Sequence, residues 1–179
     1  MLIEPNKLIL NTAKENISSI NPQPLILECA VGNREEKTFL NVWDNVHTSM
    51  AGSSLLSHVQ GEPKEKIEID MKTLDAISRE FSLKPDLVKL DLQGYEIYAL
   101  EGAKEILEMT ELFIIEFGCL EAYAGRTTPR DLINMMYNHN YCLYDIVDLI
   151  YRPFDHALAG GDFFFIKNDS ALKKYKGFI

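Results

Sequence analysis

Residues Pro85–Glu96, with the sequence PDLVKLDLQGYE, run from a loop through a short apolar segment into a turn. Within them, Leu87–Leu92 is apolar except for Lys89 and Asp91, a pattern typical of a buried β-strand. Gly94 permits a tight turn or the close approach of a ligand to the backbone. A charged side chain inside a buried strand costs free energy unless it is paired or functional, so Asp91 is a candidate site residue.

The same alternation of apolar strands and amphipathic helices continues in both directions. Upstream we expect a strand end at Leu2–Pro5, a helix with Leu10, Ala13, Ile17 and Ile20 on one face, strands at Leu25–Val31 and Thr38–Trp43, a polar loop at Asp44–Gly61, and a helix through Leu74, Ile77 and Phe81. Downstream we expect a helical stripe of Ile97, Leu100, Ala103, Ile106 and Leu107, a strand at Leu112–Phe117, a helix starting at Thr128–Asp131, and strands at Cys142–Ile150 and Asp162–Lys167.

This order predicts a single α/β domain over residues 1–179, with a doubly wound, mostly parallel sheet and an antiparallel pair of strands at its edge. In such sheets, ligands bind outside the carboxyl ends of the strands. Glu4, Ala30, Asp91 and Glu116 all fall at expected strand ends. These four residues are therefore expected to lie on the functional edge of the sheet.

Composition narrows the class of protein. The net charge of -9 disfavours binding to nucleic acid and to anionic membranes. The three cysteines are widely spaced and form neither a disulfide framework nor a metal pattern, and Cys29 and Cys142 sit in apolar runs typical of buried side chains. Reduced thiols and the absence of a recognisable signal peptide favour a soluble cytoplasmic protein. The lack of metal-ligand spacing among the cysteines and histidines predicts no metal site.

Two acids carry most of the chemical signal, and each has an ordinary alternative. Glu4 is placed to grip ribose hydroxyls, although strand ends also carry acids for solubility. Asp91 is placed to face a cleft, although it could instead cap the following helix. Glu116 repeats the pattern of Asp91 on the next strand. Among the histidines, His47 and His58 lie in the long polar loop and are the better candidates for contact with a substrate.

Taken together, these segments resemble the FkbM-type methyltransferases, which use S-adenosylmethionine to methylate hydroxyl groups. The most specific match is Pro85–Glu96, which continues through Leu100–Ala103. The further matching segments, in order and spacing, are Ile3–Asn6, Cys29–Asn33, Leu74–Asp75, Phe113–Glu116 and Asp162–Phe165.

The resemblance implies a Rossmann-like, class I methyltransferase fold and roles for particular residues. Glu4 would hold the cofactor ribose, Ala30 and Val31 would border the adenine, and Asp91 would line the cleft near the sulfonium. Two departures stand out. The family commonly has glutamate where this chain has Gln93, and the family's glycine-rich loop and preceding strand would lie upstream of Glu4.

The expected function is therefore S-adenosylmethionine-dependent O-methylation of a small molecule or saccharide, with Asp91 as the first candidate for the catalytic base, and Glu116 and His47 behind it. An NAD-dependent oxidoreductase is the alternative enzyme, because Glu4 would grip an NAD ribose equally well. A fragment, a short form completed by a partner, and an inactive interaction module also remain open. Loss of a central strand would leave open sheet edges, through which a homo-oligomer could form.

Overall fold

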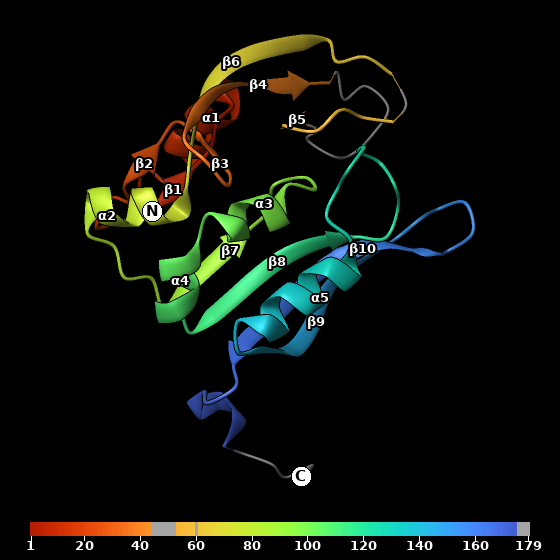
Figure 1. The fold of residues 1–179 in the computed structure, drawn as a ribbon. Coiled ribbons are helices and arrows are strands. Elements are labelled where there is room, and N and C mark those ends of the chain that lie inside the picture. The colour runs from red at the N-terminus through yellow and green to blue at the C-terminus, as the bar shows by residue number, and fades with distance from the viewer. Residues whose placement is uncertain (44–52, 60, 175–179) are drawn as a thin grey trace.

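The computed structural model describes residues 1–43, 53–59 and 61–174, which form a mixed α/β fold (Figure 1). The strands in these residues form three sheets rather than the single, mostly parallel sheet expected from the sequence. Parallel and antiparallel pairs both occur. The α/β class is thus as predicted, but the strands are divided differently.

The first sheet is the parallel pair of β1 (Leu2–Ile3) and β2 (Ile26–Leu27). The helix α1 (Lys7–Asn16) connects them, and the Asn6 side chain caps its start by accepting a hydrogen bond from the Leu8 N–H at 3.0 Å. The helix ends at Asn16, so the apolar stripe that reaches Ile20 is longer than the helix itself. Glu4 comes directly after β1, at the start of this connection.

The second sheet has the order β3-β6-β4-β5. Its longest strands, β4 and β6, form the arched antiparallel pair above the rest of the molecule in Figure 1. The predicted strand Leu25–Val31 is in fact two strands, β2 and β3, in different sheets. The bounds are β3 Ala30–Val31, β4 Glu36–Val42, β5 Ser53–Ser54 and β6 Glu65–Lys72.

The third sheet has the order β7-β8-β10-β9 and carries the candidate site. The strands β7 and β8 are parallel, whereas β10 is antiparallel to both β8 and β9. The antiparallel pair expected at the sheet edge is therefore confirmed. The bounds are β7 Leu87–Leu90, β8 Leu112–Gly118, β9 Tyr141–Tyr151 and β10 Leu158–Lys167.

The remaining helices follow the predicted positions with one break. The expected helical stripe from Ile97 to Leu107 is divided into two helices at Gly102. The Gly102 backbone lies against the Gly32 carbonyl and leaves no room for a side chain. The predicted start of α5 is confirmed, with Thr128 as its N-cap. The bounds are α2 Leu74–Phe81, α3 Glu96–Glu101, α4 Lys104–Met109, α5 Pro129–Asn138 and the 3-10 helix η1 Ala171–Lys173.

The core lies against one face of the third sheet. Alternate residues of β8 and β10, such as Phe113, Ile115 and Phe165, are buried there against helical side chains that include Leu132 and Met136. Because side chains alternate along a strand, the intervening residues point to the opposite face. This opposite face carries charged residues, among them Lys89, Glu116 and Asp162.

Candidate active site

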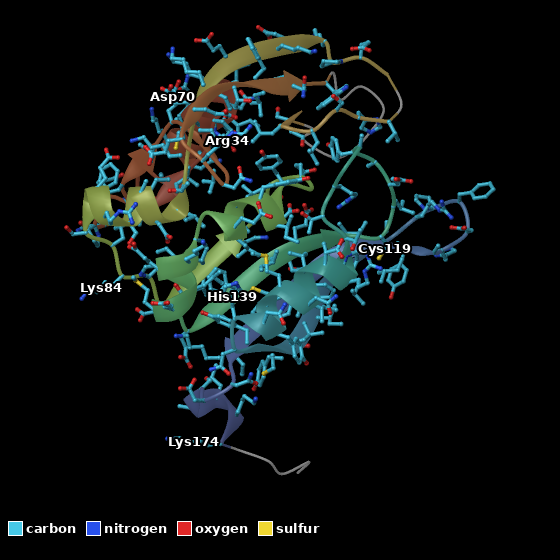
Figure 2. The ribbon with its side chains drawn as sticks, viewed as in Figure 1. Arg34, Asp70, Lys84, Cys119, His139 and Lys174 are labelled. Carbon is cyan, nitrogen blue, oxygen red and sulfur yellow. The ribbon has the colours of Figure 1, made fainter. Side chains whose placement is uncertain are left out.

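Three acidic residues predicted at strand ends are brought together. Glu4 follows β1, Asp91 follows β7, and Glu116 lies near the end of β8. Cys119, labelled in Figure 2, comes directly after β8 and marks that end of the sheet. Asp91 lies within electrostatic reach of both Glu4 and Glu116, and its charge raises the pKa of each of them. We call Glu4, Asp91 and Glu116 the acidic cluster.

The environment of Asp91 differs in one respect from the environment expected from the sequence. The strand β7 ends at Leu90, so Asp91 is not inside a buried strand, and 48% of its side chain is exposed. An exposed carboxylate next to partly buried ones is the member of the cluster that a solute can reach most easily. Its position is thus consistent with contact to a reactant, although burial no longer argues for it.

Gln93 connects two members of the acidic cluster. Its Nε2 donates a hydrogen bond to Asp91 Oδ1 at 3.0 Å and another to Glu116 Oε2 at 3.3 Å. Gln93 has a φ of 52°, a left-handed conformation that is uncommon outside glycine. This bridge was not predicted from the sequence.

Glu116 is held mainly in its protonated form at neutral pH. Burial raises its pKa to about 8, and the negative charges of Asp91 and Glu96 and a hydrogen bond with Asp91 contribute in the same direction. The nearby Arg126 guanidinium opposes this shift only in part. A carboxyl group with this pKa can hold a proton beside an ionised neighbour near physiological pH.

Lys89 links the acidic cluster to β10. Its Nζ lies 3.0 Å from Asp162 Oδ2 and 3.7 Å from Asp91 Oδ2. Asp162 is the residue paired with Glu116 across β8 and β10. Burial works to lower the Lys89 pKa, but the hydrogen bond and the charge of Asp162 outweigh it and leave that pKa raised. The ammonium group therefore stays charged and is engaged mainly by Asp162.

Glu4 is oriented by the backbone that follows it. Its Oε1 accepts a hydrogen bond from the Asn6 N–H at 2.7 Å. Burial raises the Glu4 pKa, the Asn6 hydrogen bond lowers it, and Asp91 raises it further, so the net shift is upward. Ala30 and Val31, which were expected to border the adenine, lie on β3, and both residues are buried in the protein.

The turn that carries Asp91 and Gln93 is fixed by a buried acid. Glu96 accepts hydrogen bonds from the backbone N–H groups of Leu92 and Gly94, both at 3.0 Å, and is 1% exposed. Thr127 binds the other side of the turn, donating from its hydroxyl to the Gly94 carbonyl at 2.9 Å. Asp91 is thus mounted on a hydrogen-bonded turn rather than on a free loop.

An aromatic cluster that the sequence did not indicate lies on the loops beside this site. It consists of Trp43, His58 and Tyr123, whose ring centroids are 5.3 to 5.9 Å apart. His58 and Tyr123 also form a β-bridge between the two loops. Tyr123 is within electrostatic reach of Glu116 and Arg126, which connects the aromatic cluster to the acidic cluster.

The predicted candidate base His47 cannot be compared with the structure, because it lies outside the described residues. Within residues 1–43, 53–59 and 61–174, no three His, Cys, Asp or Glu side chains are arranged to hold a metal ion. The helices in the described part of the chain are all too short or too polar to cross a membrane.

The fold gives the first indication of the class of protein. The structure is similar to the crystal structure of methyltransferase FkbM from Methylobacillus flagellatus KT, with a TM-score of 0.54 and 20% sequence identity, and the match covers 90% of this chain and 35% of that chain. The likeness is thus to the fold of a methyltransferase of which this chain covers about a third. A search of curated proteins gave no match. The sequence profile of the methyltransferase FkbM domain matches residues 1–143, so the chain belongs to the FkbM methyltransferase family.

Proposed function

We propose that this chain contributes the ribose-binding and catalytic carboxylates of an S-adenosylmethionine-dependent O-methyltransferase. The observation that supports this most directly is the meeting of Glu4, Asp91 and Glu116 at the ends of β1, β7 and β8. In the arrangement we propose, β1, β7 and β8 present their carboxyl ends to one cofactor-binding edge, as the strands of a doubly wound, Rossmann-like sheet do. Membership of the FkbM family agrees with this reading.

The residues present fit the proposed cofactor chemically. A carboxylate such as Glu4, oriented by the Asn6 N–H, can accept hydrogen bonds from two adjacent ribose hydroxyls. Negative charge around Asp91 complements a sulfonium cation. We assign the adenine border to Ala30 and Val31. When bound, the cofactor would supply an electrophilic methyl group on a positively charged sulfur.

In this proposal, Asp91 takes the proton of the acceptor hydroxyl. Its carboxylate is exposed enough to meet a solute, and Gln93 fixes its orientation through the 3.0 Å hydrogen bond. Holding the acceptor oxygen close to the methyl carbon is the main contribution that a methyltransferase can make to the rate. His47 remains a second candidate base, and the acceptor is proposed to be a hydroxyl of a small molecule or a saccharide.

Two further properties belong to the same proposal. The described part of the chain contains unpaired cysteines only, which favours a reducing, cytoplasmic location. The strands β1 and β7 each lie at the end of a sheet, and Leu87 on β7 is half-exposed, so the same proposal includes a homo-oligomer formed through this edge. Light scattering of the purified chain tests the second property directly.

Calorimetric titration with S-adenosylhomocysteine and with NAD tests the function. We expect saturable binding of S-adenosylhomocysteine, weakened roughly 10- to 100-fold in Glu4→Gln, because a hydrogen bond to a charged group contributes about 1.5 to 3 kcal/mol. Glu15→Gln, an exposed substitution on α1, is the matched control. Binding of NAD alone would favour the oxidoreductase, and a folded chain that binds neither would favour an inactive module.

Asp91→Asn separates catalysis from binding. We expect this variant to bind S-adenosylhomocysteine like the wild type and to lose methyl transfer to a panel of sugars and small alcohols, measured with a radiolabelled methyl group. The loss should be at least about 100-fold, the usual contribution of a positioned base. Unchanged turnover would remove Asp91 from the mechanism.

A further inference from the structure

Gln93 occupies a strained position that several contacts enforce. Its φ of 52° and the φ of 98° at Gly94 make a turn that returns the Gln93 side chain to the sheet end. The Ser54 hydroxyl donates to the Gln93 carbonyl at 3.1 Å, and Glu96 binds the N–H groups on either side of Gln93. Backbone strain of this kind persists only where the surroundings impose it, and it is common at functional sites.

The Gln93 amide joins two acids without adding charge. One nitrogen donates to a carboxyl oxygen of Asp91 and to one of Glu116, so it holds the two side chains at a fixed separation. A glutamate would add a third negative charge and remove the donors. A lysine would bring a positive charge that favours ionisation of both acids.

The charged groups around Asp91 and Glu116 favour one bound proton on this pair of carboxyl groups. From the neighbouring elements, Glu96 on α3, Glu4 after β1 and Asp162 on β10 add negative charge. Two cations oppose this negative charge, and each of them already makes a hydrogen bond to another group. Lys89 is hydrogen-bonded to Asp162, and Arg126 donates to the Leu120 carbonyl at 2.8 Å while its charge also reaches Glu96 and Glu116.

Burial decides which acid carries that proton. The desolvation of Glu116 is the largest contribution to its raised pKa of about 8, whereas Asp91 has nearly half of its side chain exposed. The charged form therefore resides on the better-solvated partner. Tyr123, the remaining titratable group facing Glu116, has a pKa raised by burial and stays neutral in this range.

We propose that Gln93 is a positioning residue that joins Asp91 and Glu116 into one proton-sharing pair, with the proton on Glu116 and the charge on Asp91. If the proposed function holds, the pair acts as a unit in transfer. The acceptor O–H bond breaks and its proton binds Asp91, the O–C bond forms, and the S–C bond breaks with its electron pair left on sulfur. The pair then changes from one negative charge to none, and no second proton carrier is needed.

Carboxyl-carbon NMR of the apo chain, labelled with ¹³C at the Asp and Glu side-chain carboxyls, tests the pair without any substrate. The Glu116 resonance is assigned by its disappearance in Glu116→Gln. We expect Glu116 to titrate near pH 8. We expect Asp91→Asn to lower that pKa by more than about one unit, the usual effect of removing a close like charge.

The contribution of Gln93 is measured by repeating the Asp91→Asn comparison in a Gln93→Leu background. Without the bridge, Asp91 can turn to solvent, so the pKa change of Glu116 on Asp91→Asn should shrink to less than half. Gln23→Leu is the matched control, because the Gln23 amide binds only Ser18 and Ile20 backbone carbonyls. Gln93→Asn, which keeps an amide but is too short to bridge, serves if Gln93→Leu does not fold.

An equal pKa change in both backgrounds would overturn the role of Gln93, and an ordinary Glu116 pKa would overturn the shared proton. Neither readout depends on cofactor or acceptor. A coupled pair in a chain that does not bind S-adenosylhomocysteine would support the Gln93 bridge and contradict the proposed function. The two proposals therefore fail separately.

Discussion

At the scale of single residues, Gly118 and Arg126 form a contact that determines what each position tolerates. A Cβ atom at Gly118 would collide with the Arg126 guanidinium. Moving the guanidinium aside would break the hydrogen bond that its terminal nitrogen donates to the Leu120 carbonyl at 2.8 Å. We therefore expect Gly118→Ala to lower the free energy of unfolding by about 1 to 3 kcal/mol, measured by chemical denaturation.

A double variant identifies the cause of that loss. If the collision with Arg126 is responsible, Gly118→Ala should cost much less in an Arg126→Ala background, and the two effects should be clearly non-additive. Additive losses would mean that the glycine is needed for another reason. The same variants report on the site, because the charge of Arg126 lowers the pKa of Glu116.

The sequence predicted the acids of the candidate site but not the groups that contact them. Glu4, Asp91 and Glu116 were predictable because each ends an apolar strand, and parallel strand ends meet at one edge of a sheet. Gln93 and Arg126 act through contacts that depend on a left-handed turn and on a loop folding back over β8. No periodicity in the sequence encodes such contacts, so Gln93 was visible only as a departure from the family pattern.

At the scale of secondary-structure elements, α4 depends on a cap from another helix. Its N-cap residue, Ala103, has no side chain to accept a hydrogen bond. Asp75, in the first turn of α2, accepts instead from the Glu105 N–H at 3.0 and 3.1 Å and from the Ile106 N–H at 3.1 Å. Asp75→Ala should therefore lower the free energy of unfolding by about 0.5 to 2 kcal/mol.

Two comparisons make the Asp75 prediction specific. Asp75→Asn keeps an acceptor oxygen but loses the charge, so its loss in thermal or chemical denaturation should be intermediate. Lys104→Ala, an exposed substitution at the start of the same helix, should change little. Equal stability of Asp75→Ala and wild type would show that water satisfies the start of α4 equally well.

Elements were predicted well where local signals are strong. The start of α5 carries a capping Thr128 and Pro129 at the first helical position, and both act as expected. The strand β6 was missed, because its charged residues interrupt every apolar run. Its alternation of Ile67, Ile69 and Met71 with charged residues is nevertheless the period of a half-buried strand, and a search for that period would have found it.

At the scale of the whole molecule, the sequence predicted the α/β class but not the division into three sheets. The segment from Leu25 to Val31 is one apolar run, yet β2 pairs with β1 and β3 pairs with β6. Such pairings join residues far apart in the chain, and their choice depends on packing rather than on local pattern. The acidic cluster nevertheless forms, because β1, β7 and β8 all present their carboxyl ends to it.

The acidic cluster also makes the stability of the whole molecule depend on pH. Glu116 has a folded-state pKa of about 8 against an ordinary value of 4.5, so between these pH values the native state holds a proton that the unfolded state has lost. Its stabilising contribution is complete below pH 4.5 and is lost as the pH rises through about 8. Glu4 and Glu96, with pKa values also raised mainly by burial, act in the same direction.

We therefore expect the free energy of unfolding to fall between pH 5 and pH 8, with a slope of up to about 1.4 kcal/mol per pH unit from Glu116 alone. Urea denaturation at several pH values measures this. Glu116→Gln should flatten the profile, because the amide cannot ionise, whereas the exposed Glu15→Gln, which changes the formal charge of the sequence equally, should keep the wild-type slope. Equal slopes in the two variants would assign the pH dependence to general charge repulsion in a chain of net charge -9 rather than to the acidic cluster.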